Sequence, residues 1–492
     1  MSQQEISSSR LMSQMSTSSV EQEIYDILTE EEEDDESFEE ETPSENGAQR
    51  KPRLKRKNTI TPSDYKYKVD CALPEYTPRF VNVPTVIVLV GLPARGKTYM
   101  AKKLGRYLNW IGIQCKVFNV GEYRRKAVGM DKLHDFFKVD NQEAQAIRRQ
   151  CAIDCLNDVS SWLDEGGQAA IFDATNTTRE RRRMVLDYCR RRGYKTFFME
   201  SVCNNSEIVA SNIKEVKVFS PDYKEVDKEQ AFNDFKERIK HYQAAYEPLT
   251  MEDGDLSFIK IINAGEQYLV NNIDGYLQSK SVYFLMNLHV RKRSIYLVRH
   301  AECENNVHQL LGGDTDLTKR GDEFAQTLAA FINEQDIPDL KVWTSQLKRA
   351  VQTAKYIQHA PVEPWKALNE IDYGIYDGRP VSDLNTMGPD DIKARHKNMF
   401  IYRYPLGESY SDVCARLEPV IMELERQNNV VLIVHEAVMQ IIMAYFTNHT
   451  PDEIPNLDIP LHTVFKLTPI AYGCRVERFP LEAPVSPASP EK

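Results

Sequence analysis

The chain lacks any apolar run of the roughly 20 residues that a membrane-spanning helix needs. Its nine cysteines include no CxxC pair, so neither a zinc cluster nor a disulfide framework is indicated, and reduced intracellular thiols fit best. The first residues, MSQQEISSSR, contain no apolar stretch of the kind found in secretory signals. We therefore expect a cytoplasmic protein with no membrane partner.

The chain also lacks the basic excess that is typical of nucleic-acid binders. Its formal net charge is -11, so no nucleic-acid partner is expected. A length of 492 residues is too great for one ordinary core and favours two globular domains with tails.

Residues 1–75 contain too little apolar surface to offset the entropy lost on folding, and we expect a disordered arm. An acidic run, EEEEDDESFEEE, is followed by the basic cluster RKPRLKRKN. The basic cluster places Arg56 three residues before Thr59, which makes Thr59 a candidate target of a regulatory protein kinase; a solvated charge run or localisation signal is an equal alternative. The predicted tail, residues 480–492, holds Ser486 and Ser489 before prolines, and both are candidate modification sites.

Between the tails, short apolar runs alternate with longer amphipathic stretches, a pattern that predicts an α/β fold with mainly parallel sheets. The first series comprises TVIVLV, KVFNV, AAIFDA, TFFMESV and LSFIKIINA, and the second comprises SIYLVRH, KVWTS, VVLIVHEA, TVFKLTPI and GCRVERF. We expect two three-layer α/β domains, at residues 76–290 and 291–479, joined near Ser279 to Arg293.

The first apolar run leads directly into a loop with the GxxxxGK[ST] spacing and then into a helical pattern. In that context the glycines allow backbone N–H groups to wrap the phosphates of ATP, the lysine reaches the β and γ oxygens, and the hydroxyl can coordinate Mg²⁺. The predicted nucleotide-binding residues of this loop are Gly91, Leu92, Pro93, Ala94, Arg95, Gly96, Lys97, Thr98 and Tyr99.

The run AAIFDA ends on Asp173, at the edge of a parallel sheet where ligand crevices form. Asp173 is a candidate for the Mg²⁺ shell or for orienting the attacking hydroxyl, although an aspartate there is also a common helix cap. Arginines gather on nearby predicted loops and helix starts: Arg124, Arg125, Arg148, Arg179 and Arg181. Because arginine forks match phosphate, a phosphorylated acceptor is favoured; solvated helix faces would account for about half of these arginines.

The segments GLPARGKTY, FNVGEYRR, IFDATNTTRERR and SPDY resemble the kinase domain of the 6-phosphofructo-2-kinase/fructose-2,6-bisphosphatase family. The likeness extends from about Pro84 to Phe479. It implies fructose 6-phosphate as acceptor, fructose 2,6-bisphosphate as product, and a homodimer. It also implies an acceptor pocket and, around MgATP, Lys97, Thr98, Asp173 and Asn212. The implied acceptor residues are Arg124, Arg148, Thr175, Arg181, Lys217, Arg238 and Tyr242, with Lys217 also beside the transferred phosphoryl group; Cys203 falls near the nucleotide, where a small buried thiol is an equal account.

In the second half, two histidines end apolar runs: His300 after SIYLVR and His435 after VVLIV. A single such histidine is more often structural. Together with Arg299, Arg349 and Glu370, the pair resembles the histidine phosphatase superfamily. That resemblance implies attack by His300 on a phosphoryl group, neutralisation of its oxygens by Arg299, Arg349 and His435, and proton donation by Glu370. Asn306 and Gly312 would complete the phosphate pocket, and Arg395 and Tyr410 would bind the sugar phosphate.

Several positions depart from the resembled pattern. Ala301 stands where the family usually has glycine, and the usual Gly-Arg-Ile is replaced by Gln309, Leu310 and Leu311. The family binds the sugar and its other phosphate with Tyr, Lys, Gln and Arg, and this chain has at those positions Val381, Met399, Glu436 and Gln440. Lost charge-assisted contacts cost about 1.5 to 3 kcal/mol each, so we expect weakened hydrolysis of fructose 2,6-bisphosphate. The alternatives are a C-terminal half that acts mainly as a binding and regulatory module, or one that hydrolyses other phosphoesters.

Overall fold

The computed structural model describes residues 83–129, 133–214, 221–223, 226–250, 253, 256–288, 293–358, 360–470 and 473–481. The expected N-terminal arm, Thr59, Lys217, Ser486 and Ser489 lie outside these residues. Within them, no helix combines the length and the apolarity needed to cross a bilayer.

The first sheet has six strands in the order β2-β3-β1-β4-β5-β6. Five of them are parallel and were predicted: β1 (Thr85–Val90), β2 (Cys115–Asn119), β3 (Ala169–Asp173), β4 (Lys195–Val202) and β5 (Phe258–Ile262). The sixth, β6 (Gln267–Asn271), pairs with β5 in the antiparallel sense and was not predicted. It is an edge strand with mostly exposed side chains, so it lacks the apolar run that marks the others.

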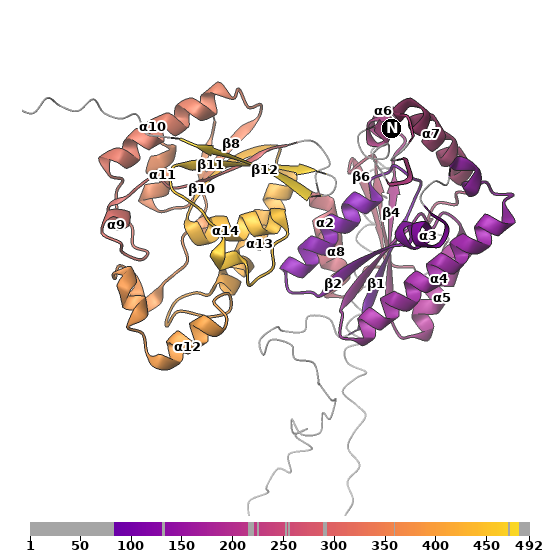
Figure 1. Cartoon of the computed structure of the whole chain (residues 1–492), viewed down its shortest axis with the longest axis horizontal. Helices are drawn as coiled ribbons and strands as arrows, with labels where there is room; N and C mark the ends of the chain where they lie inside the picture. Colours follow the sequence, from indigo (N-terminus) through magenta and orange to yellow (C-terminus); the bar gives the residue numbers. More distant parts are fainter. Residues whose placement is uncertain are drawn as a thin grey trace, which may run out of the picture. The chain divides into compact units, whose positions relative to one another are not determined.

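Helices cover both faces of this sheet (Figure 1). Alternate β1 residues pack on one side against α2 (Lys97–Trp110) and α8 (Tyr276–Asn287), and on the other side against α4 (Gln142–Asp164) and α5 (Arg179–Arg191). The remaining elements are α3 (Val120–Val128), the 3₁₀ turn η2 (His134–Phe137), α6 (Ser206–Asn212), the 3₁₀ turn η4 (Pro221–Tyr223) and α7 (Lys228–Ala244).

The expected connection at Ser279 to Arg293 is wrong for most of its length. Residues up to Asn287 belong to α8, whose Leu277, Phe284 and Leu285 are buried against the first sheet. The segment from Ser279 therefore contributes an apolar helix face to the first core.

The second sheet has the order β12-β11-β7-β10-β8-β9. The five predicted strands are β7 (Ile295–Arg299), β8 (Leu340–Thr344), β10 (Asn429–Val434), β11 (Thr463–Ile470) and β12 (Gly473–Pro480); the three-residue β9 (Val362–Pro364) was not predicted. Strands β7, β10, β8 and β9 are parallel, whereas β11 is antiparallel to both of its neighbours, β7 and β12, which makes the sheet mixed.

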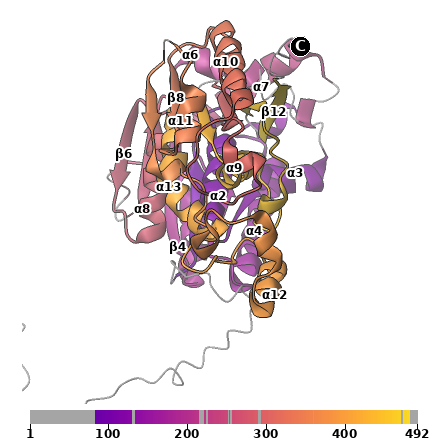
Figure 2. The ribbon, with the colours of Figure 1, turned by 90° about the vertical axis from the view of Figure 1, so that its left-hand side faces the viewer.

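One face of the second sheet packs against α10 (Lys319–Glu334) and α11 (Lys348–Ala354), and the other against α13 (Tyr410–Arg426) and α14 (Glu436–Thr447). The short α9 (Glu304–Val307) follows β7. Helix α12 (Pro389–Lys397) lies away from the strands in both views (Figures 1 and 2). Both sheets thus have the three-layer arrangement predicted from the sequence.

The described residues belong to one compact unit, and buried charges connect its two halves. Glu425 of α13 is fully buried and accepts from Lys103 of α2 at 3.0 Å, while Arg293 pairs with its other oxygen. Burial would raise the pKa of Glu425, but the charges of Lys103 and Arg293 outweigh it and lower that pKa to about 2. The carboxylate is therefore charged at neutral pH, because the two paired cations compensate the cost of burying its charge.

Candidate active sites

The loop after β1 wraps closely around its own lysine. Lys97 is buried, and its Nζ donates to the carbonyl oxygen of Leu92 at 2.6 Å. Gly91 has a φ of 131°, and a Cβ there would collide with the carbonyl oxygen of Ser201 on β4. A glycine is thus required at this position by both conformation and space.

The loop geometry fits a bound phosphate. Gly96 precedes α2 with a φ of 79°, no side chain caps the helix, and its first turn has no acidic residue. The N-terminal N–H groups and the positive end of the helix dipole therefore face an end that no carboxylate neutralises. Asn212 donates to the carbonyl oxygen of Ala94 at 3.1 Å and Ser201 to that of Arg95 at 2.5 Å, so both side chains hold the loop backbone.

Thr175 joins this loop to a second group of side chains. Its carbonyl oxygen accepts from the Gly91 N–H at 2.9 Å. Its side chain lies close enough to the hydroxyl of Tyr242, on α7, to help lower the pKa of that tyrosine. Two residues earlier, Asp173 is buried at the end of β3 and accepts from Asn119 Nδ2 at 2.6 Å. The end of β3 therefore lies between the phosphate loop and the Tyr242 region.

Three arginines from different elements surround the ring of Phe137 at the end of η2. The guanidinium carbon lies 3.7 Å from the ring centroid for Arg238, 5.4 Å for Arg124 and 5.9 Å for Arg148. Arg181 donates to the carbonyl oxygen of Arg148 at 3.0 Å. All four of these predicted acceptor arginines are therefore brought together, and the buried aromatic face lies at their centre.

One carboxylate orients two of these arginines. Asp222 of η4 accepts from Arg124 NH2 at 2.7 Å and from Arg238 NH1 at 3.2 Å. Burial would raise the pKa of Tyr242, but the charges of Arg238 and Arg148 lower it below its ordinary value. The group keeps a net excess of positive charge, as binding a phosphorylated ligand requires.

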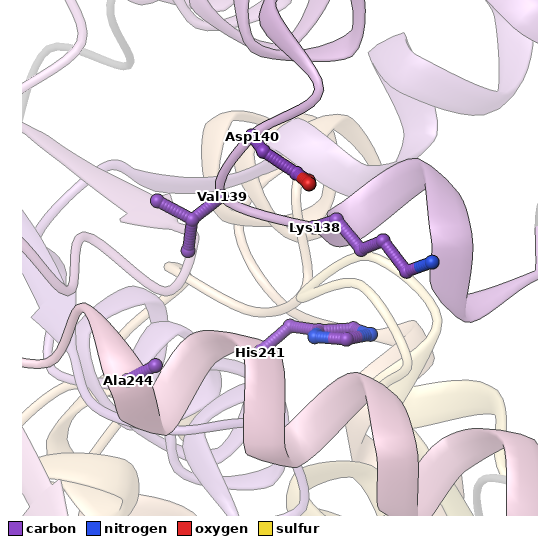
Figure 3. Close-up of a pocket in the computed structure, with 5 residues that line it drawn as sticks. All are labelled: Lys138, Val139, Asp140, His241 and Ala244. Atoms are coloured by element: carbon purple, nitrogen blue, oxygen red, sulfur yellow. The ribbon is translucent and has the colours of Figure 1, made fainter.

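A shallow hollow of about 450 Å³ lies nearby, between the segment after η2 and α7 (Figure 3). It is lined by Lys138, Val139, Asp140, His241 and Ala244. His241 Nε2 lies 3.2 Å from His134 Nδ1, so this contact fastens η2 to α7. None of the clustered arginines lines the hollow, which makes the Phe137 group the better place for a phosphate.

The second site is at the ends of β7 and β10. His300 is buried, and its Nδ1 lies 2.8 Å from the carbonyl oxygen of Ala301. Because a carbonyl can only accept, Nδ1 carries the proton and Nε2 keeps its lone pair. Burial, with the charge of Arg349, holds the pKa of His300 well below its usual range. The ring is therefore neutral, with the lone pair of Nε2 available for bonding.

His435 faces His300 with ring centroids 5.1 Å apart, and its Nε2 lies 2.7 Å from Ser345 Oγ. Burial, with Arg349 and His300 nearby, also lowers the pKa of His435. Arg349 is buried and donates to the carbonyl oxygen of Gly313 at 2.6 Å. Burial raises the pKa of Glu370, which favours the protonated form that a general acid needs.

Comparisons with known proteins match the two halves of the chain to two different family models. Residues 74–292 match the family model of 6-phosphofructo-2-kinase, and residues 295–481 match that of the histidine phosphatase superfamily (branch 1). The 6-phosphofructo-2-kinase/fructose-2,6-bisphosphatase 3 of Rattus norvegicus is 54% identical over 403 residues, which cover 81% of this chain and 72% of the relative.

The chain belongs to the 6-phosphofructo-2-kinase/fructose-2,6-bisphosphatase family. A relative of the same name from Aquarana catesbeiana is 54% identical, and the form numbered 1 from Rattus norvegicus is 53% identical; each match covers 81% of this chain and 85% of the relative. Family membership favours two activities over the alternative of a C-terminal half that only binds or regulates.

Some of the predicted site residues are exposed, whereas others have a defined structural place. Arg179 is exposed and pairs with Asp253, so the solvated-face alternative holds for it. Asn306 Oδ1 accepts from the Cys303 N–H at 3.0 Å and caps α9, and Gly312 has a φ of 57°, where a Cβ would collide with Asp377.

Some of the side chains that depart from the family pattern contact other residues of the chain. Gln440 accepts from the Tyr410 hydroxyl at 2.9 Å and donates to the carbonyl oxygen of Leu457 at 2.9 Å, so it holds Tyr410 in place. Met399 packs against the apolar core, and Val381 is exposed. Arg395 lies on α12, with its Nε buried and without a partner among the described residues.

Reasoning from the sequence missed Phe137, Asp222, Asn119 and Ser345 as parts of the two sites. Each acts on a predicted residue from a distant segment. Asp222 and Asn119 had a local signal, because they lie in the SPDY and FNVGEYRR segments that carried the resemblance.

Proposed function

We propose that the chain transfers the terminal phosphoryl group of ATP to the 2-hydroxyl of fructose 6-phosphate and hydrolyses the product at a separate histidine centre. The observation that supports the first step best is the position of Thr175. Its carbonyl oxygen accepts from the Gly91 N–H of the phosphate loop, and its side chain lies near the Tyr242 hydroxyl, so the nucleotide and the phosphorylated acceptor would lie side by side.

In the kinase step, Lys97 and the N–H groups of its loop hold the β and γ phosphates. The arginines around Phe137 hold the phosphate of fructose 6-phosphate, so the 2-hydroxyl is directed at the γ-phosphorus. That oxygen forms the new P–O bond, the bond to ADP breaks, and the hydroxyl proton passes to solvent. Thr98 and Asp173 would hold Mg²⁺, which supplies charge neutralisation at the phosphates. Lys217 stays a prediction, because it lies outside the described residues.

In the hydrolysis step, His300 Nε2 forms a P–N bond with the 2-phosphoryl group. The departing sugar oxygen takes the proton of Glu370, and Arg299 and Arg349 neutralise the phosphoryl oxygens. Water then attacks the phosphohistidine, Glu370 recovers a proton, and phosphate is released. Burial lowers the pKa of His435, and neutralisation of the phosphoryl oxygens by its ring stays a prediction.

We further propose that hydrolysis is slower than synthesis. Gln440 is committed to Tyr410 and to backbone carbonyls, and Met399 packs into the core, so neither position offers a cation to the sugar phosphate. The test is a pair of initial rates, synthesis and hydrolysis of fructose 2,6-bisphosphate, on one preparation. Brisk hydrolysis at low substrate that disappears in a His300→Ala variant would contradict the weakened site.

The remaining expectations belong to the same proposal: domains at residues 76–290 and 291–479, a cytoplasmic location, a homodimer, and modification of Thr59, Ser486 or Ser489 by protein kinases. Light scattering at several concentrations tests the homodimer. Mass spectrometry of the phosphorylated protein tests the modification sites.

A further inference from the structure

Arg299, the residue before the nucleophile, is paired with a carboxylate of its own chain. Its NH2 lies 2.8 Å from Glu436 Oε2. Glu436 is the first residue of α14 and directly follows His435. The Arg299 side chain is 18% exposed and that of Glu436 is 46% exposed, so the pair lies at the opening of the histidine centre where solvent reaches one partner.

The other contacts of Arg299 fix its position. Its NH1 donates to the carbonyl oxygen of Ile459 at 3.0 Å, and its Nε is buried without a hydrogen-bond partner in the part of the chain that the structure describes. Carboxylate and phosphate oxygens compete for the same guanidinium donors, because both groups are anions that accept charge-assisted hydrogen bonds through a pair of oxygens. Glu436 therefore holds the donor that a phosphoryl group on His300 would use.

Glu436 also faces the proposed general acid. Burial is the main cause of the raised pKa of Glu370; the charges of Arg349 and Arg299 lower that pKa, and the charge of Glu436 raises it further. The charge of Glu436 likewise contributes to the raised pKa of Tyr410. The histidine centre thus contains two carboxylates, and only one of them has a part in the proposed hydrolysis.

We propose that Glu436 is a built-in competitor of the phosphoryl group for Arg299 and so sets the phosphate affinity of the histidine centre. A bound phosphoester displaces the carboxylate from Arg299, and release of phosphate restores the pair. The effect applies to any phosphate that reaches His300, whatever sugar it carries. This inference rests on the proposed hydrolysis for its meaning, but its physical content, competition for one guanidinium, can be measured without turnover.

The direct test is calorimetric binding of inorganic phosphate to the full chain. Glu436→Gln removes the charge while keeping the shape. We expect phosphate to bind on the order of tenfold more tightly, because the variant loses both the competing ion pair with Arg299 and the repulsion between Glu436 and the phosphate. Glu436→Asp keeps the charge on a shorter arm and should give an intermediate affinity. Glu334→Gln, the same change on an exposed position of α10, is the matched control and should not alter binding.

A double-mutant cycle identifies the partner. If Glu436 acts through Arg299, the gain from Glu436→Gln disappears in an Arg299→Ala background. An unchanged phosphate affinity in Glu436→Gln overturns the proposal, and so does a gain that persists without Arg299. Thermal melting of each variant shows whether the fold is intact.

Turnover gives a second readout. Hydrolysis by Glu436→Gln should show a lower KM, and the basic limb of its kcat profile should move to lower pH, because the pKa of Glu370 falls when the neighbouring charge is removed. A chain that binds phosphate as expected, yet shows no hydrolysis dependent on His300, would contradict the proposed function and leave the competition intact.

Discussion

Replacing Phe137 by leucine tests the origin of the acceptor pocket. The ring lies 3.7 Å from the Arg238 guanidinium carbon, whereas Arg124 and Arg148 lie near the outer limit of a cation–π contact. Arg238 therefore accounts for most of the interaction, and losing it should cost about 1 to 2 kcal/mol of acceptor binding. That corresponds to a rise in the KM for fructose 6-phosphate of roughly five- to thirtyfold.

The assay is the initial rate of synthesis with fructose 6-phosphate varied at saturating ATP, then with ATP varied. The KM for ATP should not change, because the ring contacts of Phe137 are with the acceptor arginines, Phe136 and Tyr242. Phe136→Leu is the matched control: the neighbouring ring contacts Phe137 edge to face, and among the described residues no guanidinium lies over it. An unchanged KM for fructose 6-phosphate in a stable Phe137→Leu protein would refute the reasoning, as would an equal rise for ATP.

Three further predictions concern other parts of the chain. Gly91→Ala should lower synthesis by on the order of a hundredfold, because its Cβ meets the Ser201 carbonyl and displaces the phosphate loop; a rate within twofold of the parent would count against this. Ser345→Ala should lower hydrolysis by about three- to tenfold through loss of the bond to His435 and should leave synthesis unchanged, as the two initial rates will show. Glu425, whose folded pKa is lowered to about 2, contributes stability that is fully present above its unfolded pKa of about 4.3 and is lost as the pH falls toward 2. The thermal midpoint should therefore fall between pH 5 and pH 3 by more in the parent than in Glu425→Gln, and parallel curves would contradict the assignment.

The elements that the sequence predicted best are those with a strong local pattern. The run TVIVLV forms β1 with every residue buried, and the glycine and lysine spacing after it forms the phosphate loop. The edge strands β6 and β9 carry no such pattern, because one side of each has no neighbouring strand and few of their side chains are buried.

The supporting residues of both sites could not be predicted, because their roles depend on contacts between distant segments. Nothing near Phe137 indicates that Arg238, from another element, lies over its ring. From the sequence, Glu436 was only a departure from the sugar-phosphate cradle of the family, and the structure gives it a specific partner in Arg299. The spacing of residues in a motif indicated which single residues belong to a site. The contacts between residues from distant segments could be found only in the folded structure.

The most direct test of two separate centres in one chain is the synthesis and hydrolysis of fructose 2,6-bisphosphate by Lys97→Met and His300→Ala proteins, each measured on one preparation. Lys97→Met should abolish synthesis and retain the parent's hydrolysis, and His300→Ala should do the reverse. Undiminished synthesis by Lys97→Met, or hydrolysis that survives His300→Ala, would contradict the account.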